Sequence, residues 1–329
     1  MGHSNWSDVA YQARQQYRQQ TNQSAFTYDH QVRTSGVKQV HDQMNPYRVT
    51  RESRDSDAHP TSVAIAVIFD VTGSMGEVPR VLQTKLGKLM RVLVQKGYVE
   101  HPQVLFGAVG DAHCDAVPLQ IGQFESGLEM DDELGKIFLE GGGGGQVHES
   151  YELALYFMAR HTTIDCYDKR GKKGYLFTIG DEKPYPKVFR QQVSKHIGDR
   201  LSRDISIERL VEEVQERYEH FHIIPTHTAH GQSAEVQEHW RALLGERVLL
   251  LDDEAAVCET IALAIGLCEG TLFDPDQGAD DLVSAGYDAD AAVTAAAALT
   301  RFAAAHGPVV PMAAGLLPVA TYDTADGRL

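Results

Sequence analysis

The chain has 329 residues, of which 43% are apolar, so it is long enough for one large domain with extensions and too apolar to be wholly disordered. Its formal net charge of −16 would repel phosphates and argues against a nucleic-acid partner. No apolar run approaches the roughly 20 residues that span a bilayer and the first twenty residues are polar, so we expect a cytoplasmic protein that does not associate with membranes.

The first sixty residues differ in composition from the remainder. Residues 1–60 are rich in Gln, Ser, Asp, Arg and Tyr and show little sustained periodicity. They end in the charged stretch Arg51–Pro60, which offers no core residues. We therefore predict a polar N-terminal arm that is sensitive to proteases in the isolated protein and becomes ordered only on docking.

Strands and helices are predicted to alternate from Ser62 onward. The run Val63–Phe69 is short, apolar and β-branched, as in a strand buried on both faces of a parallel sheet. Residues Val117–Phe124 alternate after a tight turn, which predicts an antiparallel hairpin edge. The other predicted strands are 104–109, 175–179, 221–225 and 247–251, and the predicted helices are 78–93, 128–139, 149–161 and 255–268. This order predicts a doubly wound α/β domain over residues 61–270, with a mostly parallel sheet and helices on both faces.

The last predicted region is an acidic, Ala-rich extension over residues 271–329. Its pattern predicts two helices within 279–305, on either side of Gly286–Asp288. The arrangement is faintly similar to ubiquitin-associated three-helix modules. A plain docking helix is favoured for the Ala-rich second half on helix propensity.

Oxygen-bearing side chains follow two of the predicted strands. Asp70, Thr72 and Ser74 are spaced as Asp-x-Thr-x-Ser directly after the first strand, which lets three oxygens turn toward one point. Such a set suits a hard cation such as Mg²⁺, although a helix N-cap by Thr72 or Ser74 is the plain alternative. Asp181 follows the strand 175–179, where an ordinary turn aspartate is the alternative.

This arrangement resembles the metal-ion-dependent adhesion site of von Willebrand factor A-type (vWA) domains. The signature of that site is Asp-x-Ser/Thr-x-Ser after the first strand, with a further Asp after an adjacent apolar strand. The resemblance covers about residues 62–270 and implies metal ligation by Asp70, Thr72, Ser74 and Asp181. It also implies a Rossmann-like fold with the ligand at the carboxyl ends of the strands.

The family's intervening loop is matched in part. One branch has Gly-Gly-Gly-Asp-x-Pro-Glu opening a helix, and here the chain has Gln146 in place of the Asp and His148 in place of the Pro. Glu149 matches the Glu, so Glu149 or Gln146 is the candidate for the third ligand. Asp111, at the end of the neighbouring strand, is either an outer-shell residue or an ordinary strand-end aspartate.

The resemblance implies a non-catalytic binding module. A site with hydroxyl ligands leaves Mg²⁺ (or Mn²⁺ or Ca²⁺) receptive to an acidic residue of a protein partner, such as an AAA+ ATPase or another component of a complex. One alternative is a metal-assisted hydrolase or phosphatase with His148 or His113 as the base. The other is a metal-free scaffold.

Several histidines near the predicted strand 221–225 raise a separate question. His220 and His222 share one face of that strand, and His227 and His230 follow it. A second metal site for Zn²⁺ is one interpretation. Satisfied or solvent-facing histidines are the favoured one.

Overall fold

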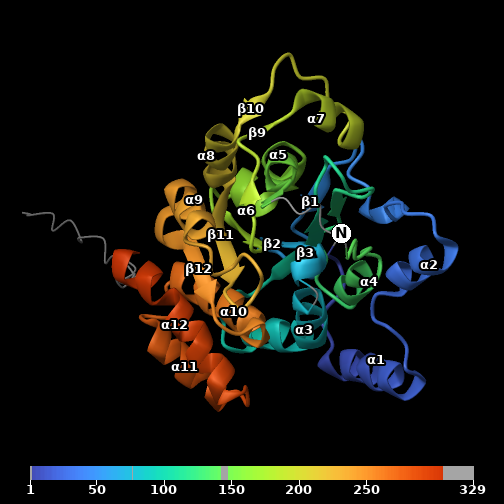
Figure 1. The fold of residues 1–329 in the computed structure, drawn as a ribbon. Coiled ribbons are helices and arrows are strands. Elements are labelled where there is room, and N and C mark those ends of the chain that lie inside the picture. The colour runs from blue at the N-terminus through green and yellow to red at the C-terminus, as the bar shows by residue number, and fades with distance from the viewer. Residues whose placement is uncertain (1, 76, 142–146, 307–329) are drawn as a thin grey trace, which may run out of the picture.

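A six-stranded sheet forms the centre of the protein in the computed structural model, which describes residues 2–75, 77–141 and 147–306 (Figure 1). In spatial order its strands are β12 (Val248–Leu251), β11 (Tyr218–Pro225), β7 (Gly174–Ile179), β2 (Val63–Asp70), β3 (Pro102–Val109) and β4 (Leu119–Ile121). Every neighbouring pair is parallel except β3 and β4, which are antiparallel. The predicted mixed α/β class and the antiparallel edge strand are therefore confirmed.

The central strand β2 shows why the sheet is buried on both faces. Its residues Val63, Ile65, Val67 and Phe69 belong to one apolar core, whereas Ala64, Ala66 and Ile68 belong to the other. The first core contains side chains of α3 (Val78–Gln95), α10 (Val257–Cys268) and α12 (Ala289–His306). The second contains side chains of α5 (Tyr151–Arg160), α8 (Ile207–Arg217) and α9 (Ala234–Leu244). Helices therefore cover both faces of the sheet, as Figure 1 shows.

Further helices and short strands lie outside the central sheet and the helices named above. The remaining helices are α1 (Asp8–Thr21), α2 (Thr27–Ser35), α4 (Glu129–Gly135), α6 (Asp165–Asp168), α7 (Arg190–His196) and α11 (Pro275–Ser284). Among the described residues there are also three short strand pairs: β1 (Arg51–Ser53) with β6 (Thr162–Ile164), β5 (His148–Glu149) with β8 (Lys183–Pro184), and β9 (Lys187–Val188) with β10 (Ile205–Ser206). Short 3₁₀ turns lie at Asp42–Met44, Gly73–Met75, Gly245–Arg247 and Glu254–Ala256.

Two predicted helices are shorter than expected because residues at one end of each form tertiary contacts and do not continue the helix. The helix predicted over 149–161 begins at Tyr151, since Glu149 pairs with Pro184 in a strand ladder. The helix predicted over 128–139 ends at Gly135, and Phe138 instead exchanges hydrogen bonds with the side chain of Gln120 on β4. The two helices predicted within 279–305 correspond to α11 and α12.

The N-terminal arm packs on the domain, which corrects the expectation of a segment with little regular structure. Tyr11 of α1 is 4% exposed within the first core, and its hydroxyl donates to the carbonyl of Gln83 on α3. Arg18 of α1 forms an ion pair of 2.6 Å with Asp131, whose side chain is fully buried. A few buried anchors and ion pairs therefore hold a helix whose sequence is too polar to suggest one. Among the described residues, no helix is long and apolar enough to cross a membrane.

Candidate metal centre

The chain changes direction across the sheet between β2 and β7. The strands β3 and β4 lie on one side of β2, and β7, β11 and β12 lie on the other. In open parallel sheets the carboxyl ends of the strands form a ligand-binding crevice at such a switch point. Asp70 is the last residue of β2, and Asp181 and Glu182 follow the end of β7. The topology therefore brings three carboxyl groups from two distant parts of the sequence to one place.

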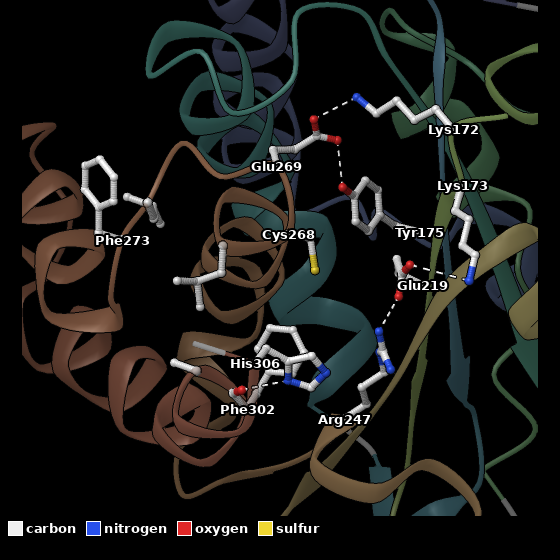
Figure 2. A pocket seen from close by; sticks show the side chains of 13 residues that line it. Lys172, Lys173, Tyr175, Glu219, Arg247, Cys268, Glu269, Phe273, Phe302 and His306 are labelled. Atoms are coloured by element: carbon white, nitrogen blue, oxygen red, sulfur yellow. Dashed lines mark hydrogen bonds and ion pairs between the residues drawn. The ribbon is translucent and has the colours of Figure 1, made fainter. Parts of the chain in front are cut away.

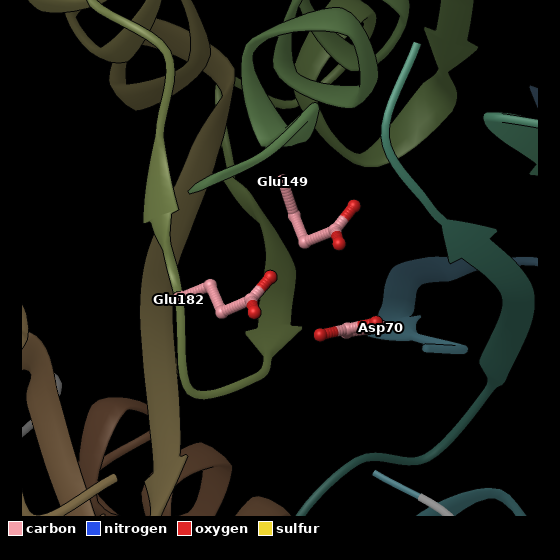
Figure 3. A group of neighbouring side chains, drawn as sticks. All are labelled: Asp70, Glu149 and Glu182. Carbon is pink, nitrogen blue, oxygen red and sulfur yellow. The ribbon is translucent and has the colours of Figure 1, made fainter. Parts of the chain in front are cut away.

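Two of these carboxyl groups, those of Asp70 and Glu182, converge with a third one from Glu149. Asp70, Glu149 and Glu182 each offer an oxygen within 4.8 Å of the other two, and their side chains point toward one another in Figure 3. Their exposed fractions are only 0%, 2% and 7%, respectively. Asp70 Oδ2, Glu149 Oε2 and Glu182 Oε2 have no hydrogen-bond partner in the described part of the chain. Because unpaired buried carboxylates are costly, this acidic triad fits a bound cation with oxygen ligands.

Each member of the acidic triad is positioned by a different element. The other oxygen of Asp70, Oδ1, accepts a hydrogen bond of 2.6 Å from the backbone N–H of Thr72, which holds the loop after β2. Glu149 is held by the pairing of β5 with β8. The carbonyl of Glu182 accepts a hydrogen bond of 2.8 Å from the indole N–H of Trp240 on α9. The geometry thus depends on contacts between segments that are far apart in sequence.

Neutral oxygens lie beside the acidic triad. Thr72 Oγ1 and the Tyr151 hydroxyl are buried and have no hydrogen-bond partner among the described residues. A Cβ added to Gly180 would lie 1.7 Å from the Tyr151 hydroxyl and 3.1 Å from the Cβ of Asp70. A glycine at this position is therefore what allows the phenol to approach the end of β7 next to Asp70. Hard cations accept such neutral oxygens together with carboxylates.

Burial and neighbouring acidic groups raise the pKa of all three carboxyl groups. For Asp70 the pKa is raised by burial and by the charges of Glu182 and Asp181, against the opposing hydrogen bond from the backbone N–H of Thr72. For Glu149 the pKa is raised by burial, by the charge of Asp70 and by a hydrogen bond shared with Glu182. Burial and the charge of Asp181 also raise the pKa of Glu182, although its bond with Glu149 opposes this. The metal-free site therefore retains protons that a cation would displace.

Asp181, the aspartate expected to bind the metal after the second strand, lies beside the acidic triad. It is fully buried, and its Oδ2 accepts a hydrogen bond of 2.9 Å from the backbone N–H of His230. The next residue, Glu182, contributes the converging oxygen instead. Sequence reasoning missed Glu182, and the only available signal was the presence of two consecutive acids after the strand.

Of the other predicted ligands, some lie at the triad and some fall wholly or partly outside the described structure. Thr72 is buried next to Asp70, and Glu149 belongs to the triad. The backbone of Ser74 lies in the 3₁₀ turn after Asp70, but its side chain falls outside the described part of the structure. Gln146 lies outside the described residues altogether.

Asp111 lies near the triad, but its carboxylate already accepts hydrogen bonds from other residues. It accepts hydrogen bonds from the backbone N–H of His113 at 2.9 Å and from the Tyr185 hydroxyl at 3.1 Å. Its charge contributes to the raised pKa of Glu182. The rings of His113 and His148 pack on that of Tyr185, with centroids at 4.5 and 5.2 Å. The two histidines considered as catalytic bases thus lie against Tyr185, outside the triad.

The four histidines of β11 and the following loop do not come together in one cluster of the described residues. His220 and His222 are fully buried and lie 3.1 and 2.9 Å from the hydroxyl of Thr178. Burial lowers the pKa of both imidazoles, which are therefore neutral core groups. His227 and His230 are partly exposed in the loop after β11. One nitrogen of each buried ring, Nδ1 of His220 and Nε2 of His222, has no partner among the described residues, so these two histidines are only partly satisfied.

A separate cavity of about 440 Å³ lies at the opposite ends of the strands (Figure 2). Its carboxylates are already paired. Glu269 accepts hydrogen bonds from Lys172 at 2.7 Å and from Tyr175 at 2.6 Å, and Glu219 forms an ion pair with Arg247. Unlike the acidic triad, this cavity has no set of converging carboxyl oxygens without partners, so the triad is the stronger candidate site.

Comparison with known proteins adds little to this geometry. No protein-family model matches the sequence, and no curated protein matches it. The pilus adhesin SpaC of Lactobacillus rhamnosus GG, in its open conformation, is similar with a TM-score of 0.44 and 10% identity, over 67% of this chain and 31% of the adhesin. Proximal thread matrix protein 1 from the mussel byssus is similar with a TM-score of 0.40 and 10% identity, over 63% of this chain and 46% of that protein. The chain thus spans less than half the length of either, and similarities this distant carry no argument about function.

Proposed function

We propose that the protein is a vWA-type binding module that holds one divalent cation at the carboxyl edge of its sheet. The observation that carries the proposal is the convergence of three buried carboxyl groups within 4.8 Å, each with an oxygen lacking a partner among the described residues. Mg²⁺ is the expected ion, with Mn²⁺ and Ca²⁺ as alternatives, because every candidate ligand atom is a hard oxygen. The position of Asp70 at the end of β2 and of Glu182 just after the neighbouring parallel strand β7 supports the doubly wound vWA interpretation.

The proposed ligand set differs from the one that the resemblance implies. Asp70, Glu149 and Glu182 are the carboxylate ligands, and Thr72 is a neutral neighbour. Asp181 acts by holding the loop that carries His230. Carboxylates from three separate elements can meet only in the folded chain, so cation binding and folding are coupled.

The proposed role of the ion is to bind an acidic group of a protein partner, such as an AAA+ ATPase or another component of a complex. The net charge of −16 would otherwise repel that group, so binding should depend on the ion. Loss of one such contact in a partly dry site costs about 2–4 kcal/mol. This corresponds to a roughly 30- to 1,000-fold weaker complex.

Binding of the ion is tested first, by thermal unfolding of the full chain. Mg²⁺ should stabilise the folded state by about 2.7 kcal/mol at roughly 100 times its Kd, and Asp70→Asn should abolish this response without unfolding the protein. The matched control is Asp165→Asn, because Asp165 is also buried but is paired with Arg54 and Lys169. An Asp70→Asn variant that responds to Mg²⁺ like the wild type would contradict the proposal.

Partner binding is tested second, with a purified candidate partner in Mg²⁺ and in EDTA. Glu182→Gln should weaken the complex in Mg²⁺ and have no effect in EDTA, where both proteins bind equally poorly. Binding that EDTA leaves unchanged would remove the adhesion-type mechanism. Turnover in a panel of phosphoesters and esters with Mg²⁺ or Mn²⁺, lost on His148→Ala, would favour a hydrolase instead.

A further inference from the structure

We propose that helix α2 of the N-terminal arm positions the metal-binding loop after β2, through Asp29, Arg33 and the segment 138–141. The N-terminal arm then belongs to the structure that supports the site. The inference rests on the proposed function for its metal-binding readout, and it has a second readout that needs no metal.

The first step is the contact of α2 with Leu139. Asp29 Oδ1 accepts a hydrogen bond of 3.2 Å from the Leu139 N–H, and Arg33 Nη2 donates one of 2.6 Å to the Leu139 carbonyl. Asp29 and Arg33 are also joined to each other, one helical turn apart, by an ion pair of 2.8 Å. Two linked side chains of the arm thus hold both backbone polar groups of one residue in the domain.

Neighbouring residues of the arm extend this contact. Val32 of α2 packs with Phe138 in a small apolar cluster. The charged ends of Arg33 and Lys38 lie 5.9 and 5.8 Å from the centroid of the Phe138 ring. Lys38 also pairs at 2.5 Å with Glu140, whose side chain is 3% exposed. Apolar packing, cation–π contacts and a half-buried ion pair therefore hold residues 138–140 from the side of the arm.

The sheet holds the same segment from its other side. Gln120 on the edge strand β4 accepts a hydrogen bond of 2.9 Å from the Phe138 N–H and donates one of 2.7 Å to the Phe138 carbonyl. Residues 138–140 have no ladder of their own, so their position is set by side chains of β4 and of the arm. Removing one of the two supports should leave the segment less restrained.

The segment then contacts the metal-binding loop directly. The Gly141 N–H donates a hydrogen bond of 3.1 Å to the carbonyl of Val71, and the Val71 N–H donates one of 3.1 Å to Val109 at the end of β3. Val71 is the residue between Asp70 and Thr72. The backbone that carries both candidate ligands is therefore held by β3 on one side and by Gly141 on the other.

A continuous set of contacts thus leads from the arm to the candidate ligands. Metal sites bind more tightly when outer contacts hold the ligands in place before the ion arrives, and losing such contacts costs about 10- to 100-fold in affinity for directly bonded outer residues. Arg33 acts through Leu139, Gly141 and Val71, so its effect should be smaller, about 3- to 10-fold.

The same arm supplies a matched control. Arg18 of α1 pairs with Asp131 on α4 at 2.6 Å, and no contact with residues 138–141 is seen for it in the described structure. Because Asp131 is fully buried and Arg18 is 17% exposed, Arg18→Ala should destabilise the fold more than Arg33→Ala, whose side chain is 54% exposed. Arg33→Ala should therefore lower the Mg²⁺ affinity more than Arg18→Ala does, whereas Arg18→Ala should lower the stability more.

The experiment compares full-length variants by calorimetric titration with Mg²⁺. Arg33→Ala and Asp29→Ala should each bind Mg²⁺ about 3- to 10-fold more weakly than the wild type, and the double variant should be no worse than the product of the two. Arg18→Ala should bind like the wild type despite its lower melting temperature. Arg33→Lys keeps a donor for the Leu139 carbonyl and should recover part of the affinity.

Hydrogen exchange of the metal-free protein supplies the second readout. Peptides covering residues 138–141 and 69–73 should exchange faster in Arg33→Ala than in the wild type, and Arg18→Ala should leave both peptides unchanged. Unchanged exchange and unchanged Mg²⁺ affinity in Arg33→Ala would overturn the inference. If the wild type binds no Mg²⁺ but exchange at 69–73 responds to Arg33→Ala, the proposed function fails and the link between the arm and the loop stands.

Discussion

At the scale of single residues, the site depends on which buried carboxyl groups face one another. Asp181 and Glu182 are adjacent and both buried, yet their environments differ. Asp181 already accepts a backbone hydrogen bond from His230, whereas Glu182 Oε2 has no partner in the described structure. The unpaired oxygen gains most from a cation, so the two residues should contribute differently to metal binding.

We expect Glu182→Gln to weaken Mg²⁺ binding at least about tenfold more than Asp181→Asn, because only Glu182 offers an oxygen to the acidic triad. Calorimetric titration of the two variants measures the difference. The substitutions are matched, since each replaces one carboxylate oxygen by an amide nitrogen. A larger loss for Asp181→Asn would restore the ligand set that the sequence motif implies.

The raised pKa values of the triad predict how stability and binding depend on pH. Folded metal-free protein keeps protons on carboxyl groups that the unfolded chain releases above about pH 4, so its stability should fall as pH rises from that value toward the raised folded pKa values. In the proposed site Mg²⁺ would displace these protons, so its affinity should increase with pH. Titration in buffers of different ionisation enthalpy counts the protons released. A heat of binding that is the same in all buffers would count against displacement of protons from the triad.

At the scale of elements, helix α9 supports the site from one face of the sheet. The indole N–H of Trp240 donates to the carbonyl of Glu182, and its ring stacks on His222 with centroids 3.6 Å apart. The ring of Tyr151 meets both Trp240 and His222 edge-on, at 5.3 and 5.5 Å. The turn that carries Glu182 is therefore tied to a rigid aromatic group in the core.

Trp240 should report Mg²⁺ binding by its fluorescence, because it contacts the residue that moves or loses a proton on binding. The chain has 2 tryptophans, so Trp6→Phe leaves Trp240 as the only tryptophan and should keep the change of tryptophan emission on Mg²⁺ binding. Trp240→Phe should abolish the response and weaken Mg²⁺ binding by about tenfold or less, since it removes the hydrogen bond to Glu182. A response that survives in Trp240→Phe would show that the signal comes from elsewhere.

At the scale of the whole molecule, the C-terminal helices share a core with the sheet. Phe302 of α12 is 4% exposed and meets Phe221 of β11 edge-on, with ring centroids 5.0 Å apart. Several alanines of α12 lie in the same core as α3 and α10. Elements that share one core are expected to unfold together.

Phe302→Ala should therefore destabilise the entire domain by about 3–5 kcal/mol, because it empties a space between α12 and the sheet. Val293→Ala is the matched control, since Val293 lies on the same helix but is 63% exposed, and its effect should stay within about 0.5 kcal/mol. Urea unfolding monitored by circular dichroism should show a single transition in both variants. A separate early transition in Phe302→Ala would mean that residues 271–306 unfold independently of the sheet.

Most of the sheet could be predicted because its strands leave strong local signals. The run Val63–Phe69 is apolar at every position, and the structure buries it on both faces. Asp70 was also predictable, since a carboxylate at the end of a central buried strand lies at the ligand-binding edge by topology alone. The arm was not predictable, because α1 and α2 each bury one side chain, Tyr11 and Val32, and otherwise rely on polar contacts with distant residues, such as those of Arg18 with Asp131 and of Arg33 with Leu139.

The sequence by itself determined the mixed α/β class, the order of the strands along the chain and the presence of oxygen-bearing residues after two of them. Only the tertiary structure decided which of these residues meet. Glu149 reaches the triad because β5 pairs with β8. Glu182 rather than Asp181 offers an oxygen to the triad, from a turn whose backbone Trp240 holds through the Glu182 carbonyl. Local periodicity records burial and backbone preference, whereas the direction of a side chain in a loop is set by contacts with residues far away in the chain.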